Sequence, residues 1–346
     1  MPSPTPWARP FDPLPRAFIS GTGLIGTSVA LGLAETGWET LGWDLDADRL
    51  AGAVAVGAVE ASDPAVVASL TGDDLVVLAG PPKAVIESLA TLNTASLVID
   101  VAAVKAPVLA VETTVRFVGT HPMAGREQSG PEAASAGLFR GTAWVVTTDN
   151  AGDDDLDRVT GIVIGLGARA VTMTAAEHDA AVAKVSHLPQ LLAATLLEGA
   201  ANDPHAMELA AGSFRDLTRV ASSDPAMWLD ILELNSEAVA SAADDLKTAL
   251  DAAVEGGSLE ETLEDARVLR ATLGPTLALV RVSLEDKPGE LAGVGEALAA
   301  SGVDVRDLQL RHAPHGGGGV LTLSVRPGEA GALASALSDA GFELID

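Results

Sequence analysis

The chain has 346 residues, 48% of them hydrophobic, which is more than a single hydrophobic core usually organises. We therefore expect two or three domains. Its 21 Lys and Arg residues stand against 48 Asp and Glu residues, and a formal net charge of −27 repels nucleic-acid phosphates and anionic lipid, so we expect neither as a partner. The absence of cysteine excludes disulfides, thiol catalysis and cysteine metal sites, and we expect no metal.

The N-terminal residues 1–15 are rich in proline and lack the apolar core of a signal peptide. We interpret this segment as a disordered tail on a cytoplasmic protein. No later stretch has the length and uniform apolar character of a membrane span.

Residues 16–173 alternate short segments rich in Val, Ile and Leu with Ala-rich helical segments. The apolar segments are 17–20, 40–44, 75–80, 97–101, 116–122 and 143–148, and a further helix and strand follow them. Because these segments are apolar on both faces, they predict the buried strands of a parallel sheet with crossover helices. This pattern is typical of an α/β Rossmann domain.

The sequence pattern changes twice after residue 173. Residues 174–273 read as long Ala-, Leu- and Glu-rich helices, which predicts an all-helical second domain for substrate binding and dimerisation. Residues 276–346 read as strand, helix, strand, strand, helix and strand, which predicts a ferredoxin-like α+β domain.

A glycine-rich turn follows the first strand. Strand 17–20 leads into Gly21-Thr22-Gly23-Leu24-Ile25-Gly26, and a helix comes next. In this pattern Gly21 permits a tight turn, Gly23 lets main-chain N–H groups approach a pyrophosphate, and Gly26 lets helix and strand pack closely. The helix N-terminus stabilises negative charge. The order of strand, glycines and helix predicts a dinucleotide site.

The second strand ends in Asp44, at the distance from the glycines where an acidic residue contacts the ribose. Its carboxylate can accept from a 2′-hydroxyl and would repel a 2′-phosphate, which favours NAD over NADP, although Arg49 nearby leaves NADP open. Further cofactor contacts are expected from Leu24, Ile25, Gly80, Pro81 and Asp100.

Three candidate side chains stand apart from the remaining polar residues. His121 is expected at the carboxyl end of a parallel strand, where such sheets bind ligands. His187 precedes Pro189, which should disturb its helix and turn the imidazole toward a cavity. Arg219 lies in a helical domain with few cations and is a candidate for carboxylate binding. We interpret His205, His312 and His315 as structural.

The chain resembles the prephenate dehydrogenase family in segments that follow that family's order and approximate spacing. These segments are HPMAGREQSG (121–130), MTAAEHD (173–179), SHLP (186–189), AAGSFRDLTRVASSDPAMW (210–228) and the turn DVAAVK (100–105). The resemblance implies NAD-dependent oxidative decarboxylation of prephenate to 4-hydroxyphenylpyruvate in tyrosine biosynthesis. The alternative within the family is arogenate dehydrogenase activity, which forms tyrosine directly.

The resemblance also implies roles for individual residues. His121 would hydrogen-bond the ring hydroxyl, and a neutral imidazole suits the acceptance of its proton at cytosolic pH. His187 and Arg219 would shape the substrate site, with Arg219 holding a carboxylate. Further substrate contacts are expected from Ser186, Glu127, Ser129 and, from a neighbouring subunit, Trp228.

Two positions depart from the family pattern. Ala103 stands where the D-x-x-S-x-K turn commonly has a serine that supports the catalytic histidine. A water or Ser186 replaces that hydroxyl, or activity is reduced. Gln190 stands where S-H-L-P-H often ends in a second histidine, which changes the pocket for the substrate side chain.

Residues 276–346 resemble ACT domains, through the segment Asp286-Lys287-Pro288-Gly289-Glu290-Leu291 after the first strand. Such modules bind amino acids between paired copies. The resemblance therefore implies a homodimer with L-tyrosine as a feedback effector, or a dimerisation module without a ligand.

Two other functions are compatible with parts of the sequence. A β-hydroxyacid or 6-phosphogluconate-type dehydrogenase would use a catalytic lysine on the helical domain, for which Lys184 is the candidate, but segments 121–125 and 214–219 would then have no role. A non-catalytic sensor of NAD and an amino acid is suggested by Ala103 together with the ACT-like module. Turnover of a cyclohexadienyl substrate distinguishes an enzyme from such a sensor.

Overall fold

The computed structural model describes residues 14–125, 128–255, 259–272, 278–312 and 318–345. Most of the predicted tail, Glu127 and His315 lie outside these ranges. The chain forms two compact units, Met1–Lys247 and Thr248–Asp346. The first unit holds the predicted Rossmann domain and most of the predicted helical domain.

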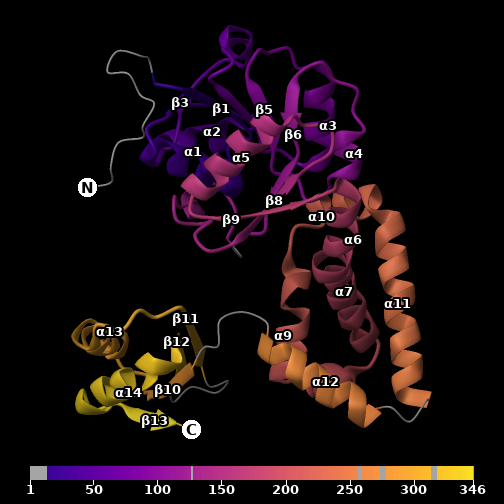
Figure 1. Cartoon of the computed structure of the whole chain (residues 1–346). Coiled ribbons are helices and arrows are strands. Elements are labelled where there is room, and N and C mark those ends of the chain that lie inside the picture. Colours follow the sequence, from indigo (N-terminus) through magenta and orange to yellow (C-terminus); the bar gives the residue numbers. More distant parts are fainter. Residues whose placement is uncertain (1–13, 126–127, 256–258, 273–277, 313–317, 346) are drawn as a thin grey trace. The chain divides into compact units, whose positions relative to one another are not determined.

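A six-stranded parallel sheet organises the first half of unit 1 (Figure 1). Its order is β3-β2-β1-β4-β5-β6, so the strand order reverses between β1 and β4, where sheets of this kind bind ligands. The predicted segments 17–20, 40–44, 75–80 and 97–101 are strands of this sheet, and β3 was not predicted. The bounds are β1 (Arg16–Ser20), β2 (Glu39–Trp43), β3 (Glu60–Ala61), β4 (Leu75–Leu78), β5 (Leu97–Asp100) and β6 (Arg116–Val118).

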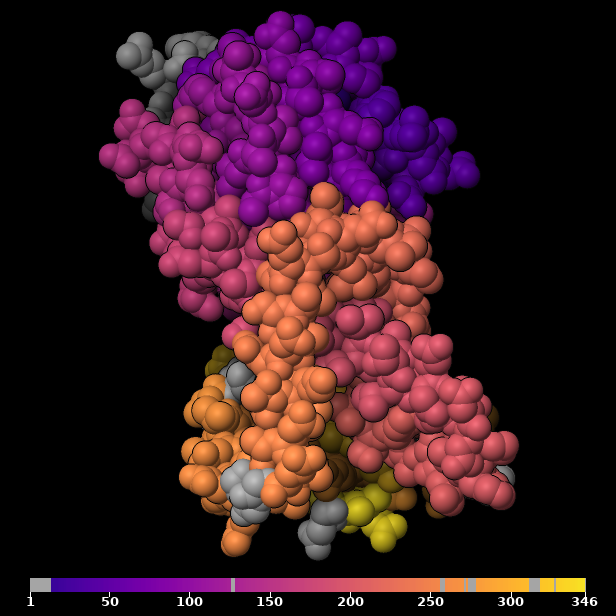
Figure 2. Space-filling model, turned by 90° about the vertical axis from the view of Figure 1, so that its right-hand side faces the viewer, coloured from indigo at the N-terminus to yellow at the C-terminus, as the bar shows by residue number. Residues whose placement is uncertain are grey.

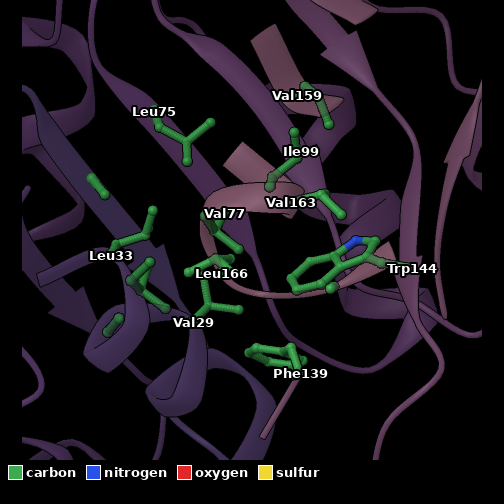
Figure 3. Close-up of a cluster of buried hydrophobic side chains, with 14 of the residues drawn as sticks. Val29, Leu33, Leu75, Val77, Ile99, Phe139, Trp144, Val159, Val163 and Leu166 are labelled. Carbon is green, nitrogen blue, oxygen red and sulfur yellow. The ribbon is translucent and has the colours of Figure 1, made fainter. Parts of the chain in front are cut away.

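Helices cover both faces of this sheet. On one face lie α1 (Leu24–Glu35), α2 (Ala47–Ala55) and α5 (Asp153–Gly165), and on the other η1 (Pro64–Ser69), α3 (Pro82–Thr91) and α4 (Ala106–Leu109). Figure 3 shows the first of the two cores, built mainly of Val, Ala, Leu and Ile. Phe139 and Trp144 add one ring pair to it, with centroids 4.7 Å apart.

The predictions that 116–122 forms one strand of the parallel sheet and that 143–148 forms another are wrong. Strand β6 ends before Gly119. The residues after Gly119 form β7 (Thr120–Pro122) in a second sheet with β8 (Ala143–Thr147) and β9 (Arg169–Met173). The packing of Gly119 against Thr147 favours glycine, because a Cβ there would lie 2.8 Å from the Thr147 hydroxyl. His121 therefore lies on a short strand antiparallel to β8, not at the carboxyl end of a parallel strand.

The described residues from 174 to 272 contain helices and no strand, as predicted. Those of unit 1 are α6 (Ala175–Val182), the π-helix η3 (Ala183–His187), α7 (Leu188–Ala201), α8 (Pro204–Glu208), α9 (Gly212–Thr218), η4 (Arg219–Ser222), α10 (Pro225–Leu234) and α11 (Ser236–Glu255), which ends beyond the unit boundary. Short η2 (Pro131–Ala133) precedes β8. Figure 2 shows these helices, rose to orange, open to solvent on the face turned toward the viewer.

The continuous run Ala175–Ala201 (27 residues) is apolar and long enough to cross a membrane by length and composition alone. The core helix of a soluble protein passes the same test, so the run is weak evidence for a membrane span. The run also carries His178, Asp179 and His187, which are buried in unit 1.

Unit 2 follows the predicted succession of strand, helix, strand, strand, helix and strand. Its four-stranded antiparallel sheet has the order β11-β12-β10-β13, and apolar side chains of β10 and β12 pack against those of the two helices. Its elements are α12 (Leu259–Thr272), β10 (Ala278–Leu284), α13 (Glu290–Ser301), β11 (Asp307–His312), β12 (Gly319–Val325), η5 (Pro327–Glu329), α14 (Ala330–Asp339) and β13 (Glu343–Ile345).

Candidate active site

The turn between β1 and α1 has the shape of a pyrophosphate cradle. Gly21 has φ +100°, and a Cβ there would lie 2.7 Å from the main chain of Ala79. A Cβ at Gly26 would lie 1.9 Å from the carbonyl oxygen of Gly21, so turn and helix can approach only with glycine at both positions. A Cβ at Gly23 would meet nothing within 4 Å, which leaves open space above the N-terminus of α1. This cradle suits an anionic group.

Asp44, just beyond β2, borders the same turn. Its carboxylate accepts hydrogen bonds from the main-chain N–H of Thr22 at 2.6 Å and of Asp46 at 2.9 Å. A carboxylate has about four acceptor positions, so a lone pair remains for a ribose hydroxyl. Other predicted cofactor residues lie nearby in the fold: Leu24 and Ile25 open α1, and Gly80 and Pro81 follow β4. These residues fit a bound dinucleotide.

Asp100, predicted to contact the cofactor, is fully buried. Its carboxylate accepts from the main-chain N–H of Thr120 at 2.9 Å, from that of Ala102 at 3.0 Å, and from the ammonium of the equally buried Lys105. Lys105 also donates to the carbonyl oxygen of Thr120 at 2.7 Å. Asp100 therefore fixes the main chain next to His121, and its predicted cofactor contact stays a prediction.

His121 is hydrogen-bonded to a second histidine. Its Nδ1 lies 2.9 Å from Nε2 of His178, and Nδ1 of His178 lies 2.7 Å from a carboxylate oxygen of Asp179. Asp179 is itself held by α4, because it accepts from the main-chain N–H groups of Lys105 and Ala106, each at 2.8 Å. A chain of three side chains thus ends at His121.

The proton positions in this chain follow from its chemistry. A carboxylate only accepts, so Nδ1 of His178 carries a proton, and in the singly protonated ring Nε2 is an acceptor. Nδ1 of His121 must then donate to it. The lone pair of a neutral His121 consequently lies on Nε2, which is the atom available as a base.

The environment keeps both ends of the chain in these states. Burial lowers the pKa of His121 well below its usual 6.5, and the nearby His178, Lys105 and His187 lower it further. Burial alone would raise the pKa of Asp179, but hydrogen bonds from His178 and from the main chain of Ala106 and Lys105 hold it below its usual value. The chain therefore has a carboxylate at one end, Asp179, and a neutral imidazole at the other, His121.

A second branch leaves Asp179 through its main chain. The carbonyl oxygen of Asp179 accepts from Nδ2 of Asn235 at 2.9 Å, and the same Nδ2 lies 3.0 Å from Nδ1 of His187. The rings of His187 and Trp228 meet edge to face with centroids 6.1 Å apart. The site therefore joins both predicted histidines and Trp228, which the resemblance expected from a neighbouring subunit and which here reaches His187 of its own chain.

His187 occupies the end of the π-helix η3, directly before the helix that contains Pro189. The predicted disturbance of the helix is thus present as a π-turn, a feature that is often found at functional sites. Burial lowers the pKa of His187 to about 4, although the charge of Asp179 acts to raise it. The ring is neutral at physiological pH.

The other predicted residues differ in how far they are exposed. Ser186 is half-buried beside His187, Ser129 is exposed after β7, and Arg219 is exposed at the start of η4, which packs against α7. Lys184, the candidate lysine of the rival dehydrogenase class, is exposed and forms an ion pair with Asp245 at 3.2 Å. Nothing in this geometry gives Lys184 a catalytic task.

Sequence reasoning missed three residues of the site: His178, Asp179 and Asn235. The first two lie in the segment MTAAEHD, which carried the resemblance, and adjacent His and Asp in a buried helix were a signal for a polar network. Asn235 gave no such signal, since a lone Asn between two helices usually indicates a cap. Ala103 has no hydroxyl to offer, and His178 is the group that holds Nδ1 of His121.

Comparisons with known proteins identify the family. Residues 29–172 match the model of the prephenate dehydrogenase nucleotide-binding domain, and residues 174–265 match that of the prephenate dehydrogenase dimerization domain. The chain is 33% identical over 357 residues to the probable prephenate dehydrogenase NovF of Streptomyces niveus, covering 91% of this chain and 95% of the relative.

Two solved structures share the fold. Prephenate dehydrogenase from A. aeolicus, in complex with hydroxyphenyl propionate and NAD+, gives a TM-score of 0.69 at 28% identity and covers 76% of this chain and 100% of that chain. Synechocystis arogenate dehydrogenase gives a TM-score of 0.60 at 27% identity, with 74% and 97% covered. With both domain models matched in sequence order, the chain belongs to the prephenate dehydrogenase family.

Proposed function

We propose that this chain is an NAD-dependent prephenate dehydrogenase, which converts prephenate to 4-hydroxyphenylpyruvate and CO₂ with reduction of NAD to NADH. The observation that carries the proposal is the Asp179–His178–His121 chain, which leaves Nε2 of His121 as an uncharged base. NAD is favoured over NADP because Asp44 would repel a 2′-phosphate at the end of β2.

The residues of the chain supply alignment and proton transfer. Bound NAD supplies the acceptor for the hydride that leaves C4 of the ring. Nε2 of His121 accepts the proton of the C4 hydroxyl, and His178 stabilises the resulting cation through Nδ1 of His121. The bond from C1 to the ring carboxylate breaks, CO₂ departs, and its electron pair completes the aromatic ring. Arg219 is the proposed carboxylate clamp.

The test is NADH formation by the full chain with prephenate, and separately with arogenate, using NAD and then NADP. Turnover of prephenate with NAD is the expected result. Turnover of arogenate alone would assign the alternative activity, which the Synechocystis relative makes the natural second candidate. Binding of NAD without turnover of either compound would overturn the proposal and favour the sensor.

We also propose that unit 2 is an ACT-like module that binds L-tyrosine as an effector. A cavity of about 300 Å³, at the small end of the range for ligand pockets, is lined by the β10–α13 loop. Lys287 and Glu290 in that lining offer opposite charges for an amino acid's carboxylate and ammonium. Suppression of turnover by tyrosine, lost in Gly289→Val, supports this role, because Gly289 has φ +99° at the start of α13. Unchanged activity at saturating tyrosine would leave a module without a ligand.

A homodimer is the proposed assembly. Residues 174–265 match a dimerization domain, and helices in that range expose large apolar side chains, among them Leu217 at 67% and Leu229 at 60%. A dimer interface would bury such side chains. Light scattering during gel filtration measures the mass directly, and a monomeric mass at micromolar concentration would contradict the proposal.

A further inference from the structure

Asn235 lies between α10 and α11, and its side chain reaches η3 and α6. It is buried, with 6% of its surface exposed. Its Nδ2 contacts two groups, the carbonyl oxygen of Asp179 at 2.9 Å and Nδ1 of His187 at 3.0 Å. One amide group therefore contacts both Asp179, which holds His121 through His178, and His187.

The contacts of Asn235 decide which nitrogen of His187 carries the proton. A carbonyl oxygen only accepts, so the amide atom that faces Asp179 must be nitrogen and not oxygen. That nitrogen has a second hydrogen, which meets Nδ1 of His187. Nδ1 must then be unprotonated, and the proton of the neutral ring lies on Nε2.

The Nε2–H group of His187 is buried and has no hydrogen-bond partner among the residues that the structure describes. An unpaired buried donor costs about 1–3 kcal/mol unless a partner arrives. The partner that satisfies it must be an acceptor atom. A ligand oxygen fits, whereas an ammonium does not, since it can only donate.

We propose that Asn235 is a positioning residue that fixes His187 as its Nε2–H tautomer, so that His187 donates a hydrogen bond to an acceptor oxygen of the substrate. The identity of the substrate rests on the proposed function, but the tautomer does not. The polar groups of prephenate's side chain are a keto oxygen and a carboxylate, which are both acceptors. The ammonium of arogenate would leave Nε2–H unpaired if it lay at this position, so Asn235 favours the keto acid.

The tautomer can be measured without turnover. Long-range proton–nitrogen NMR correlations of protein made with isotopically labelled histidine distinguish Nε2–H, Nδ1–H and doubly protonated rings. The resonances of His187 are assigned by their loss in His187→Gln. We expect the Nε2–H form in the ligand-free protein, a mixture in Asn235→Ala, and mainly Nδ1–H in Asn235→Asp, whose carboxylate would accept from Nδ1. Asn202→Ala is the matched control, because the exposed amide of Asn202 donates to the carbonyl of Glu198 at the end of α7.

A kinetic measurement accompanies the spectra. In Asn235→Asp the KM for prephenate should rise about tenfold or more while the KM for NAD stays unchanged, because the donor to the substrate has been lost. An Nδ1–H tautomer in the wild type, or an undiminished Nε2–H form in Asn235→Ala, would overturn the inference. The wild-type spectrum alone shows which nitrogen of His187 carries the proton, so the inference can be contradicted even if a variant does not fold. The expected tautomers without any turnover would instead overturn the proposed function.

Discussion

Nδ1 of His121 lies 2.9 Å from Nε2 of His178, and this contact sets the chemistry of the site. It makes His121 a donor at one nitrogen and a base at the other. It also places a second imidazole, backed by Asp179, where it can stabilise a protonated His121. The proton-accepting role of His121 therefore depends on a residue that does not itself reach the substrate.

The first prediction concerns these two histidines. His121→Asn should lower kcat by about 10²-fold or more, because the general base is lost. His178→Gln should lower kcat by about tenfold to a hundredfold, since His121 remains but its tautomer and orientation are no longer fixed. The double variant should be no slower than His121→Asn alone. Steady-state kinetics with NAD binding measured in parallel test this, and additive losses would show that the two rings act independently.

The second prediction concerns the pH profile of kcat/KM. Protonation of His121 removes the base, and its lowered pKa means that this happens only well below pH 6.5. Activity should stay level as the pH falls through 6.5 and decline at lower pH. A wild-type decline centred at pH 6.5 or above would contradict the assignment of His121.

The third prediction concerns stability in acid. His187 has a pKa of about 4 in the folded chain against 6.5 as its ordinary value. Between these pH values the unfolded chain binds a proton that the folded chain refuses, so the free energy of unfolding falls as the pH falls from 6.5 toward 4. At pH 4.5 the loss should be about 2–3 kcal/mol. Urea unfolding at pH 7.5 and 4.5 should show a loss smaller by this amount in His187→Gln, and equal losses would refute the buried neutral state.

The fourth prediction separates two glycines of the cofactor turn. Gly23→Ala should leave the melting temperature unchanged and weaken NAD binding by about tenfold or more, because its methyl group enters open space needed by the dinucleotide. Gly21→Ala should lower the melting temperature as well, because Gly21 has φ +100° and a close main-chain neighbour. Calorimetry measures both quantities. Normal NAD affinity in Gly23→Ala would place the pyrophosphate elsewhere.

The sequence predicted the periodic parts of this fold well, because buried strands and amphipathic helices can be recognised from the local pattern of apolar residues. It failed at 116–122, where the apolar pattern continues although Gly119 moves the chain into another sheet. That break depends on how closely Thr147 approaches, which is a tertiary contact and leaves no periodic signal.

The candidate site was likewise predicted in part, where local sequence carried a signal. His121 and His187 were predicted from local context, and Asp44 from its distance to the glycines. The contact of Asp100 with the buried Lys105 was not predicted, because an acid at a strand end has the same local pattern whether it faces a ligand or a lysine. Asn235 was missed because its two partners come from helices more than forty residues away.

Asp179 serves the two histidines through different parts of the same residue: its side chain holds His178, and its main-chain carbonyl holds Asn235. Any amino acid supplies a carbonyl, but few supply a carboxylate. Evolutionary change at this position would therefore tune the strength of the base at His121 and leave the donor at His187 untouched. Proton transfer and substrate choice can thus diverge separately among descendants of this chain, although both are anchored to one residue.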